Sequence, residues 1–553
     1  MIDVVPLGGL GEIGLNTMAV VHGGERMLID CGLMFPRSDQ FGVDVVIPDF
    51  GWLLDEPASL QAIVLTHAHE DHLGALPWLL RELPVPVYGT RFTLALARHK
   101  LEEAGLRADL REMAPRTPFR VGTQFTVEPI RVTHSVPDAV ALAVTTSSGT
   151  AIHTGDFKLD GMPTDGQLTD LERFGELGER GVTVLLSDST NAEVPGWTGS
   201  EQLVRETFER LVSTATQRVI VGLFGSHLHR VHALMQLARR FNRRVILGGR
   251  SLIRNVELAR EAGILSVPEG LLVAWENAGE VPPAQQLVIC TGAQAEPLAA
   301  LSRLADGGGG PVRIDDGDTV VLSSRTIPGN EQAVSLLVNR LLARGARLAY
   351  ASIEPGVHVS GHASQDEQRK MIEVVQPKHF VPIHGELRHL LQHRELARRA
   401  GLDDSRTFVL TDGDSLRLDP SGVTTRGKVP AGHLLTRRDG FGTVTEAVLA
   451  ERRAVAADGV VVCAVALPPG GGTLLSGPTV SARGLQGDEL AALSLAADGA
   501  RLALSEMPTR ELADDERVRE ALTRGVRRVF KQLLGTRPHV MPVVLRVTAA
   551  KRS

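Results

Sequence analysis

The stretch THAHEDHLG, residues 66–74, places three histidines and one aspartate within six positions at the end of an apolar run. A strand over AIVL just before it directs His67 and His69, two residues apart, to the same side, so both imidazoles can reach one ion. Asp71 and His72 follow at the turn into LGALPWLLREL and are expected to point from a helix start toward a second ion. This pattern predicts a metal site. The alternative is a polar turn with solvated histidines.

A centre with two ions needs further ligands, and three polar residues end other apolar runs. They are His134 in IRVTHSVPDAVAL, Asp156 in AIHTGDFK and His384 in HFVPIHGE. Each alone could be a capping or turn residue, but together with HAHEDH they complete a ligand set. Asp30, which closes RMLIDCG, could hold the HAHEDH loop by hydrogen bonds, although a turn-forming aspartate is an equally good interpretation.

The elements that must position these residues are short strands. Residues 1–190 alternate β-rich runs with turns, and several of these runs end on a polar cluster, where open α/β sheets place their sites. From about residue 200 the units lengthen: RVIVGLFGS leads into the helical pattern of HLHRVHALMQLARRF and then into RVILGG. Such alternation predicts βαβ units of a second domain.

The C-terminal hundred residues form a further segment after KVPAGHLLTRRDGFG, which predicts a linker. Within this segment DDERVREALTRGVRRVFKQLL carries Val518, Leu522, Val526 and Phe530 on one helical stripe. The stripe could form an interface or a small core of its own, and the core is the simpler interpretation.

Length and composition limit the function classes. The 553 residues exceed the roughly 250–300 at which one core stops growing, so two or three domains are expected. A formal charge of -6 gives no overall nucleic-acid signature. The start MIDVVPLGGLGEIGLN lacks the pattern of a signal peptide, no apolar run reaches membrane-spanning length, and the three cysteines form no CxxC pair. These features predict a cytoplasmic protein with reduced thiols and no membrane contact.

Several motifs resemble known families. HAHEDH, the histidine of VTHS and the aspartates of HTGDF and LIDCG are similar, in order and context, to the motifs of the metallo-β-lactamase superfamily. LLSDST resembles motif A of the β-CASP nucleases, HVSGHAS motif B and PIHGE motif C. PLGGLGEIGLN, GSHLHR, HVSGHASQDE and the long C-terminal extension are similar to the ribonuclease J family across nearly the whole chain.

This resemblance implies the fold class: α/β, with a metallo-β-lactamase αββα sandwich interrupted by an inserted β-CASP α/β domain, plus a small α+β C-terminal domain. The expected boundaries are 1–200 and 358–430 for the two lactamase segments, 201–357 for β-CASP, 431–450 for the linker and 451–553 for the last domain. His384 would then be reached only after the inserted domain has returned the chain to the first sheet.

The resemblance also implies two divalent metal ions per subunit. The ligands would be His67, His69 and His134 for one ion and Asp71, His72 and His384 for the other, with Asp156 bridging. Two ions about 3.5–4 Å apart can lower the pKa of a bridging water and bind a scissile phosphate, so that an activated hydroxide attacks the phosphodiester. Histidine with carboxylate suits zinc and also manganese, and the sequence does not choose between them.

Two further residues have expected roles in the reaction. His362 in VSGHAS is the candidate general acid for the leaving 3′ oxygen, or stabilises the transition state. Asp188 in LLSDST would support it by orienting a ligand histidine or a water. The alternative for His362 is a packed loop histidine.

A pocket for a 5′ monophosphate is expected next to these residues, because helix starts and glycine-adjacent amides favour phosphate. Its candidate residues are Ser226, His227, His358, Val359, Ser360, Gly361, His362, Ala363 and Ser364. Ser226 could instead be only a helix N-cap. The six arginines of ARRFNRRVILGGRSLIRN, between 239 and 254, could hold an RNA backbone or form a solvated helix face.

The function implied is a metal-dependent ribonuclease with 5′→3′ exonuclease activity that favours 5′-monophosphorylated single-stranded RNA, and some endonuclease activity, in RNA maturation and mRNA decay. The implied assembly is a homodimer or tetramer that associates with other RNA-decay proteins.

Four alternatives remain. A small-molecule hydrolase would share the metal ligands but would not need LLSDST or HVSGHAS, and the β-CASP segments argue against a tRNA 3′-end nuclease. A β-CASP DNA repair nuclease is nearer, but a histidine in motif C favours the RNA branch. A non-catalytic RNA-binding scaffold is disfavoured because no ligand position is substituted.

Overall fold

The computed structural model of the chain describes residues 1–548 except 309, 328, 420, 421, 438–441 and 486. Two compact units are present: Met1–Phe35 with Val46–Leu434, and Pro36–Val45 with Leu435–Ser553. Part of the predicted linker, 438–441, lies outside the described residues. Within the described ranges, no helix is long and apolar enough to span a membrane.

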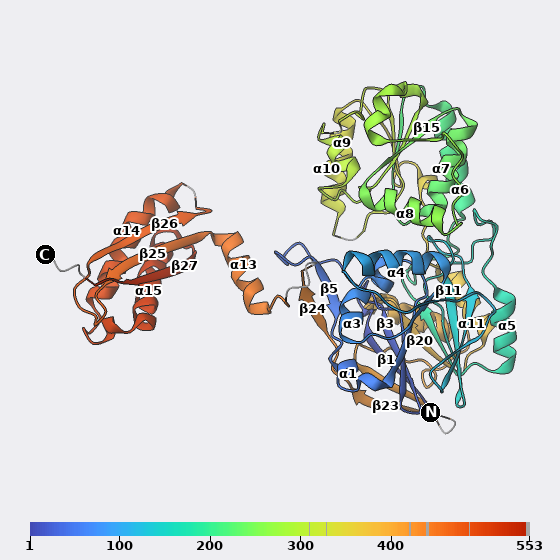
Figure 1. Cartoon of the computed structure of the whole chain (residues 1–553), viewed down its shortest axis with the longest axis horizontal. Helices are drawn as coiled ribbons and strands as arrows, with labels where there is room; N and C mark the ends of the chain where they lie inside the picture. Colours follow the sequence, from blue (N-terminus) through green and yellow to red (C-terminus); the bar gives the residue numbers. More distant parts are fainter. Residues whose placement is uncertain (309, 328, 420–421, 438–441, 486, 549–553) are drawn as a thin grey trace. The chain divides into compact units, whose positions relative to one another are not determined.

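The first unit begins with an eight-stranded sheet (Figure 1). Its strands in spatial order are β23 (Gly422–Lys428), β22 (Asp414–Asp419), β1 (Ile2–Gly8), β3 (Thr17–His22), β4 (Glu25–Ile29), β6 (Leu60–Val64), β7 (Val87–Gly89) and β8 (Leu110–Glu112). The last four run parallel to one another, so the carboxyl ends of β4 and β6 meet at one edge. Asp30 follows β4 and the HAHEDH stretch follows β6 at that edge.

A second sheet of six strands faces the first. Its strands in order are β20 (His379–Ile383), β13 (Val184–Asp188), β12 (Gly149–His153), β11 (Val140–Thr146), β10 (Phe125–Arg131) and β9 (Phe119–Val121). Here the expectation from the sequence was wrong: β20, which leads to His384, joins this second sheet beside β13, and only β22 and β23 rejoin the first. Because β12, β13 and β20 are parallel, Asp156, Asp188 and His384 meet at one edge.

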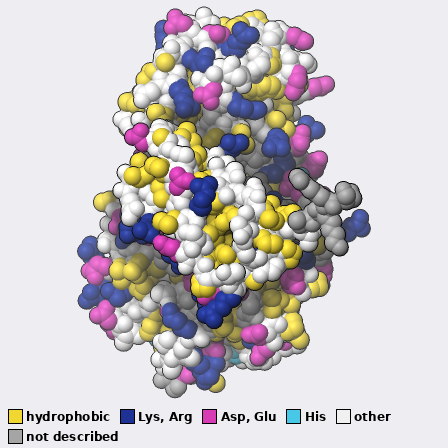
Figure 2. Space-filling view, turned by 90° about the vertical axis from the view of Figure 1, so that its left-hand side faces the viewer, with side chains coloured by type: hydrophobic (Ala, Val, Ile, Leu, Met, Phe, Trp, Pro, Cys, Tyr) yellow, Lys and Arg dark blue, Asp and Glu magenta, His cyan; other side chains and the backbone are white. Residues whose placement is uncertain are grey.

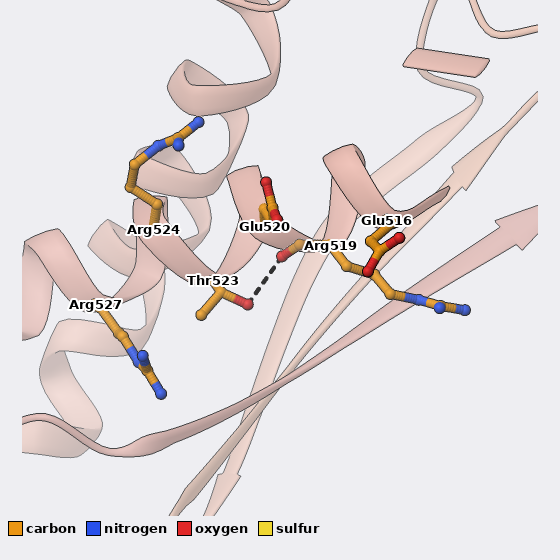
Figure 3. A pocket seen from close by; sticks show the side chains of 6 residues that line it. All are labelled: Glu516, Arg519, Glu520, Thr523, Arg524 and Arg527. Atoms are coloured by element: carbon orange, nitrogen blue, oxygen red, sulfur yellow. Dashed lines mark hydrogen bonds between the residues drawn. The ribbon is translucent and has the colours of Figure 1, made fainter. Parts of the chain in front are cut away.

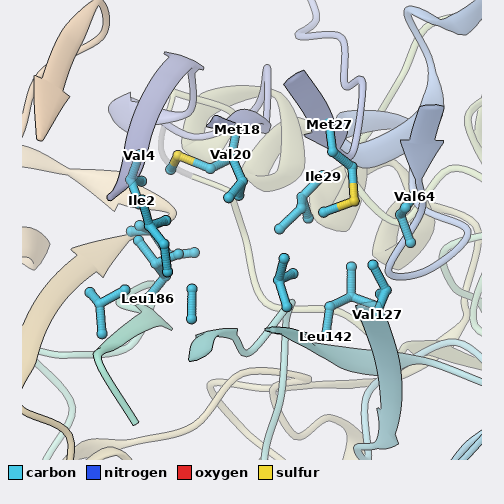
Figure 4. Close-up of a cluster of buried hydrophobic side chains, with 14 of the residues drawn as sticks. Ile2, Val4, Met18, Val20, Met27, Ile29, Val64, Val127, Leu142 and Leu186 are labelled. Atoms are coloured by element: carbon cyan, nitrogen blue, oxygen red, sulfur yellow. The ribbon is translucent and has the colours of Figure 1, made fainter. Parts of the chain in front are cut away.

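The core of this domain lies between the two sheets. Apolar side chains from both inner faces meet there, including Ile2, Val20, Ile29, Val127 and Leu142, as Figure 4 shows. Helices cover the outer faces: α1 (Gly51–Leu54), α2 (Glu70–Leu73), α3 (Leu76–Glu82), α4 (Arg91–Glu103), α5 (Leu171–Arg180), α11 (Gln365–Val375) and α12 (Leu387–Arg399). Further short strands are β2 (Leu10–Gly11), which pairs with β21 (Gly385–Glu386), and β5 (Val45–Pro48) and β24 (His433–Thr436). The expected αββα sandwich is confirmed.

The inserted domain is a parallel six-stranded sheet with helices on both faces (Figure 1). Its strands in order are β16 (Leu272–Val273), β15 (Arg244–Gly248), β17 (Gln286–Cys290), β14 (Val219–Gly222), β18 (Thr319–Leu322) and β19 (Arg347–Tyr350). Its helices are α6 (Glu201–Thr214), α7 (Leu228–Arg240), α8 (Arg250–Glu261), α9 (Ala300–Ala305) and α10 (Glu331–Ala343). The predicted βαβ units are therefore present, because each crossover between parallel strands carries a helix or a long connection.

The second unit contains a three-stranded sheet packed on two long helices. Its elements are α13 (Glu446–Asp458), β25 (Val460–Leu467), β26 (Ser476–Arg483), α14 (Asp488–Ser505), α15 (Asp515–Leu534) and β27 (His539–Arg546). The stripe Val518, Leu522, Val526 and Phe530 is fully buried against this sheet and α14, so it forms the domain's own core. The opposite face of α15 carries polar side chains such as Arg524 and Arg527, which Figure 3 shows.

Close contact between α14 and α15 generates a stability prediction. A Cβ added at Gly525 would lie 2.6 Å from the carbonyl oxygen of Gly499 and 2.8 Å from the Cα of Ala500, which are backbone atoms that cannot rotate away. Gly525→Ala is therefore expected to destabilise this domain by about 1–3 kcal/mol through overpacking. Faster amide hydrogen exchange over α14 and α15 in the full chain would show it.

The matched control for this prediction is Gly470→Ala in the same domain, where an added Cβ meets no atom within 4 Å. Unchanged exchange rates in both variants would contradict the prediction, because they would mean that the helices separate at no cost.

Candidate metal centre

Seven side chains predicted as ligands converge where the two sheets meet. His67 and His69 follow β6, Asp71 and His72 lie in α2, His134 follows β10, Asp156 follows β12, and His384 follows β20. Their donor atoms form overlapping groups, each with all its atoms within 4.8 Å of one another. The structure thus brings together every ligand candidate that the sequence offered.

The first group consists of three imidazoles and one carboxylate oxygen. The Nδ1 atom of His69 lies 3.1 Å from Nε2 of His67 and 3.2 Å from Nε2 of His134. Oδ2 of Asp156 lies 3.5 Å from Nε2 of His67 and 3.7 Å from Nε2 of His134. Three ring nitrogens and one oxygen therefore point at a common centre, as a cation with nitrogen and oxygen ligands requires.

The second group uses the other oxygen of the same carboxylate. Oδ1 of Asp156 lies 3.3 Å from Nε2 of His72 and 3.5 Å from Nε2 of His384. Oδ2 of Asp71 lies 3.6 Å from Nε2 of His72 and 3.4 Å from Nε2 of His384. Asp156 thus faces one group with each oxygen, which is the position of a bridging ligand.

The residues fit a divalent metal. Oδ1 of Asp156 is buried and has no hydrogen-bond partner among the described residues, a costly state unless a cation compensates it. The ring nitrogens of His67 and His69 lie 3.1 Å apart, close enough for one cation to bind both. Histidine with carboxylate is a donor set that suits zinc and manganese.

Outer hydrogen bonds set which nitrogen of His67 and His72 faces the centre. Asp30 accepts hydrogen bonds from the amide and hydroxyl of Thr66, at 2.7 and 2.8 Å, and its Oδ2 lies 2.8 Å from Nδ1 of His72. The Thr66 hydroxyl donates to Asp30 and so accepts from Nδ1 of His67, at 3.0 Å. Both histidines therefore carry their proton on Nδ1 and present the Nε2 lone pair to the metal position.

The same logic applies to His134 and His384. Nδ1 of His134 donates to the carbonyl of Gly361 at 2.8 Å. Nδ1 of His384 lies 2.7 Å from the hydroxyl of Thr190, which donates its own hydrogen to Asp188 at 2.8 Å and can therefore only accept. Asp30 and His384 also have positive φ angles, +63° and +54°, so the surrounding contacts hold strained backbone at the centre.

His362 and Asp188 lie beside both ligand groups. Nδ1 of His362 donates to Oδ2 of Asp188 at 2.8 Å, and the His362 ring lies 5.1 Å from the ring of His134 and 5.4 Å from that of His384. Burial lowers the pKa of His362, but the charges of Asp188 and Asp156 outweigh this and raise it above its usual value. This arrangement can supply a proton next to the metal position.

The residues expected to bind phosphate lie near one another, but several are held by their own contacts. Val359 and Ala363 are buried, and Ser364 caps α11. Ser360 accepts a hydrogen bond from Asn191 at 2.8 Å. These four side chains are structural, so a ligand would meet this loop through its backbone and the imidazoles of His358 and His362.

The remaining pocket candidates come from the start of α7. The N-cap position of this helix is His227, not Ser226, so the alternative interpretation of Ser226 as the N-cap is wrong. Ser226 is partly exposed, and His227 is buried with its Nδ1 lacking a hydrogen-bond partner among the described residues.

The six arginines between 239 and 254 do not act alike. Arg243 is buried and donates to backbone carbonyls of Ala215, Gln217 and Gln286, so it is structural. Arg240 is exposed and pairs with Glu209. The remaining four are exposed or partly exposed: Arg239, Arg244, Arg250 and Arg254. On the face drawn in Figure 2, basic and acidic side chains are interspersed.

Sequence reasoning missed several residues that touch the centre. Thr66 and Thr190 stand next to predicted residues in the chain, so neighbourhood in THAHEDH and SDST was a usable signal. The amide Nδ2 of Asn16, near the N-terminus, lies 3.0 Å from Nε2 of His72. The buried pair Glu201 and Arg230, near the predicted pocket, had no local signal.

Histidines and carboxylates at the facing ends of two sheets, with a domain inserted before the last ligand, define a metallo-hydrolase of the metallo-β-lactamase class. Family models agree: the metallo-β-lactamase superfamily matches residues 10–183, the ribonuclease J β-CASP domain 216–341, a Zn-dependent metallo-hydrolase RNA specificity domain 349–409, and the ribonuclease J C-terminal domain 447–547.

Similar proteins extend over the whole chain. Ribonuclease J of Thermus thermophilus is 39% identical and the match covers 98% of this chain and 95% of that protein. Ribonuclease J of Synechocystis is 42% identical, and the match covers 88% of this chain and 76% of that protein. Ribonuclease J of Mycobacterium tuberculosis is 38% identical, and the match covers 98% of this chain and 97% of that protein. The chain belongs to the ribonuclease J family and is a metal-dependent ribonuclease.

A solved structure agrees on the fold alone. A protein of unknown function from Enterococcus faecalis V583 aligns with a TM-score of 0.53 and 15% sequence identity, covering 75% of this chain and 99% of that one.

Asp30 is expected to control metal affinity. Asparagine tolerates positive φ, so Asp30→Asn keeps the backbone but places an amide against groups that must donate. Metal affinity should fall by about 10- to 100-fold, measured by competition with a chelator. Asp55→Asn, an exposed carboxylate, is the control. Equal affinity in Asp30→Asn and the wild type would reduce Asp30 to a turn residue.

Metal loading is expected to release protons from the second ligand group. Burial lowers the pKa of His72 and His384, but the carboxylates of Asp156 and Asp71 outweigh it, raising that of His72 well above normal and that of His384 to about 9. Both are therefore protonated at pH 7 without metal and must lose a proton to bind it, so apparent affinity should rise from pH 7 to 9.

Calorimetric titration with metal in two buffers of different ionisation heat measures this release. His69, with a pKa lowered by burial to about 4, is already neutral at pH 7 and contributes none. His384→Asn should reduce the number of protons released by about one. A binding heat that is independent of buffer in the wild type would contradict the prediction.

Proposed function

We propose that this ribonuclease degrades single-stranded RNA from the 5′ end and favours a 5′ monophosphate, with some endonuclease activity. The observation that supports the proposal is the position of the loop 358–364, which contacts a candidate metal ligand and contains residues expected to bind the phosphate. Its Gly361 carbonyl holds the ligand His134, and its His358 lies in the predicted phosphate pocket. A phosphate bound by this loop would bring the first phosphodiester of the RNA to the metal centre.

Two divalent ions, zinc or manganese, are proposed at the two ligand groups. When bound, they supply positive charge to the phosphate oxygens and lower the pKa of the attacking water. The chain's own contribution is orientation: the Nε2 atoms of His67, His72, His134 and His384 are fixed inward, and Asp156 holds the two groups at one distance.

His362 is proposed to protonate the leaving 3′ oxygen. Its Nδ1 hydrogen is donated to Asp188, so the proton available for transfer is on Nε2. The raised pKa favours the form of the ring that keeps this proton. Because the bond to the 3′ oxygen breaks, the downstream product carries a new 5′ monophosphate, and each product is again a preferred substrate.

Other proposals rest on the family rather than on any contact. They are a homodimer or tetramer, a cytoplasmic location, participation in RNA maturation and mRNA decay, and association with other RNA-decay proteins.

Degradation of one uniformly labelled RNA with a monophosphate, triphosphate or hydroxyl 5′ end tests the proposal, with manganese or zinc added. The monophosphate substrate should release mononucleotides fastest. His69→Ala should lower the rate by more than about 100-fold, since it removes a ligand rather than a residue that orients one. His99→Ala, a histidine on α4 away from the centre, should leave it unchanged.

Internal fragments regardless of the 5′ end would replace the exonuclease proposal by an endonuclease. Cleavage that is unaffected in His69→Ala would mean that the metal centre does not carry the reaction.

A further inference from the structure

A buried ion pair lies between the inserted domain and the loop 358–364. Arg230 of α7 and Glu201 at the start of α6 are 1% and 5% exposed. The guanidinium binds the carboxylate with two hydrogen bonds, from Nε at 2.9 Å and from Nη2 at 2.8 Å. This geometry fixes the plane of the guanidinium and leaves its remaining donors directed elsewhere.

The remaining donors of Arg230 reach the loop and the end of β18. Nη2 donates to the carbonyl of Val359 at 2.7 Å, and Nη1 donates to Nδ1 of His358 at 2.7 Å. Nη1 also contacts the carbonyl and hydroxyl of Ser323, both at 3.1 Å. One side chain thus holds the backbone and the imidazole of the first two residues of the loop.

The contact with Arg230 determines the tautomer of His358. A guanidinium has no acceptor and does not lose its proton, so Nδ1 of His358 must accept and the ring hydrogen must be on Nε2. Nε2 is the ring nitrogen that does not contact Arg230. Burial and the charge of Arg230 lower the pKa of His358 to about 3, so the ring remains a neutral donor.

The other half of the ion pair faces the second pocket histidine. Oε1 of Glu201 lies 3.6 Å from Nε2 of His227. The amide of Glu201 donates to Asp160 at 2.9 Å, and Lys158 pairs with Asp160 at 3.1 Å. Asp160 follows the bridging ligand Asp156 by four residues, so the ion pair is anchored on the segment that carries this ligand.

Stability alone is a poor explanation for these charges. Taking two ions out of water costs so much that apolar residues of similar volume often stabilise a fold as well. Apolar residues cannot donate hydrogen bonds, so they could neither hold the carbonyl of Val359 nor select the tautomer of His358. The position of Arg230 between the two predicted phosphate-binding histidines indicates that this is its use.

We propose that Arg230, clamped by Glu201, is a positioning residue for recognition of the RNA's 5′ phosphate. It fixes Val359 and orients His358 with its Nε2 hydrogen toward the phosphate. The inference rests on the proposed 5′-end preference and names the residue that sets it.

The test compares kcat and KM for one RNA with a 5′ monophosphate or a 5′ hydroxyl. In the full-length metal-loaded protein, Arg230→Lys keeps the positive charge but loses the planar set of guanidinium donors that binds Glu201, His358 and Val359 together. The ratio of kcat/KM between the two ends should fall about tenfold, mainly through a higher KM for the phosphorylated RNA. Arg210→Lys, in the exposed pair of Arg210 with Glu354, should keep the ratio.

A double-variant cycle separates positioning from general support of the fold. If Arg230 acts through His358, Arg230→Lys combined with His358→Gln should lower the ratio no further than the stronger single variant. If the reduction of the ratio in the double variant equals the product of the two single reductions, the two residues act independently and the proposal is overturned. If Arg230→Lys does not fold, Glu201→Gln, which keeps the shape of the clamp but not its charge, takes its place and should lower the ratio in the same direction.

The outcomes distinguish this inference from the proposed function. A wild-type protein that treats both ends alike defeats the 5′-end preference itself. The wild type could instead prefer the 5′ phosphate while the folded Arg230→Lys and Glu201→Gln variants prefer it equally. That result would overturn the role of Arg230 and leave the proposed 5′-end preference intact.

Discussion

The structure depends on one buried carboxylate, that of Asp156. Each of its oxygens faces two imidazole nitrogens, and Oδ1 has no hydrogen-bond donor among the described residues. A buried charge in this state is stable only beside a cation. The ring nitrogens that face it must therefore be free of protons when the metal is bound. This agrees with the outer hydrogen bonds at Nδ1 of His67, His72, His134 and His384, which leave the Nε2 lone pairs available to a metal.

This constraint explains the architecture around the centre. Ligands on both oxygens of one carboxylate must come from two directions, and two facing sheets provide them. Parallel strands β12, β13 and β20 bring Asp156, Asp188 and His384 to one edge, although almost two hundred residues separate the last two in sequence. An inserted domain is compatible with this pairing because it leaves after β13 and returns before β20, and so leaves the register of the sheet unchanged.

How much the sequence revealed depends on the range of each interaction. The local spacing of HAHEDH predicted four candidate ligands, and strand ends predicted His134, Asp156 and His384. Which sheet receives β20 is a choice between long-range pairings that local pattern does not encode, and here the expectation failed. The sequence did not predict the buried pair of Arg230 and Glu201 either. A charged residue on an amphipathic helix is expected to face solvent unless its neighbours in the fold are known.

In the proposed function, the loop 358–364 connects the 5′ end of the RNA to the metal centre, and its short length limits the distance between them. At most roughly 11 Å of chain separates His358 from Gly361, since each residue spans no more than about 3.6 Å. Arg230 donates to the imidazole of the first of these residues, and the candidate ligand His134 donates to the carbonyl of the second. A segment fixed at both ends has little freedom to change the distance between a bound 5′ phosphate and the metal position. An end held there would place the same bond at the centre in every cycle, which favours stepwise removal of short products over cleavage at scattered internal sites.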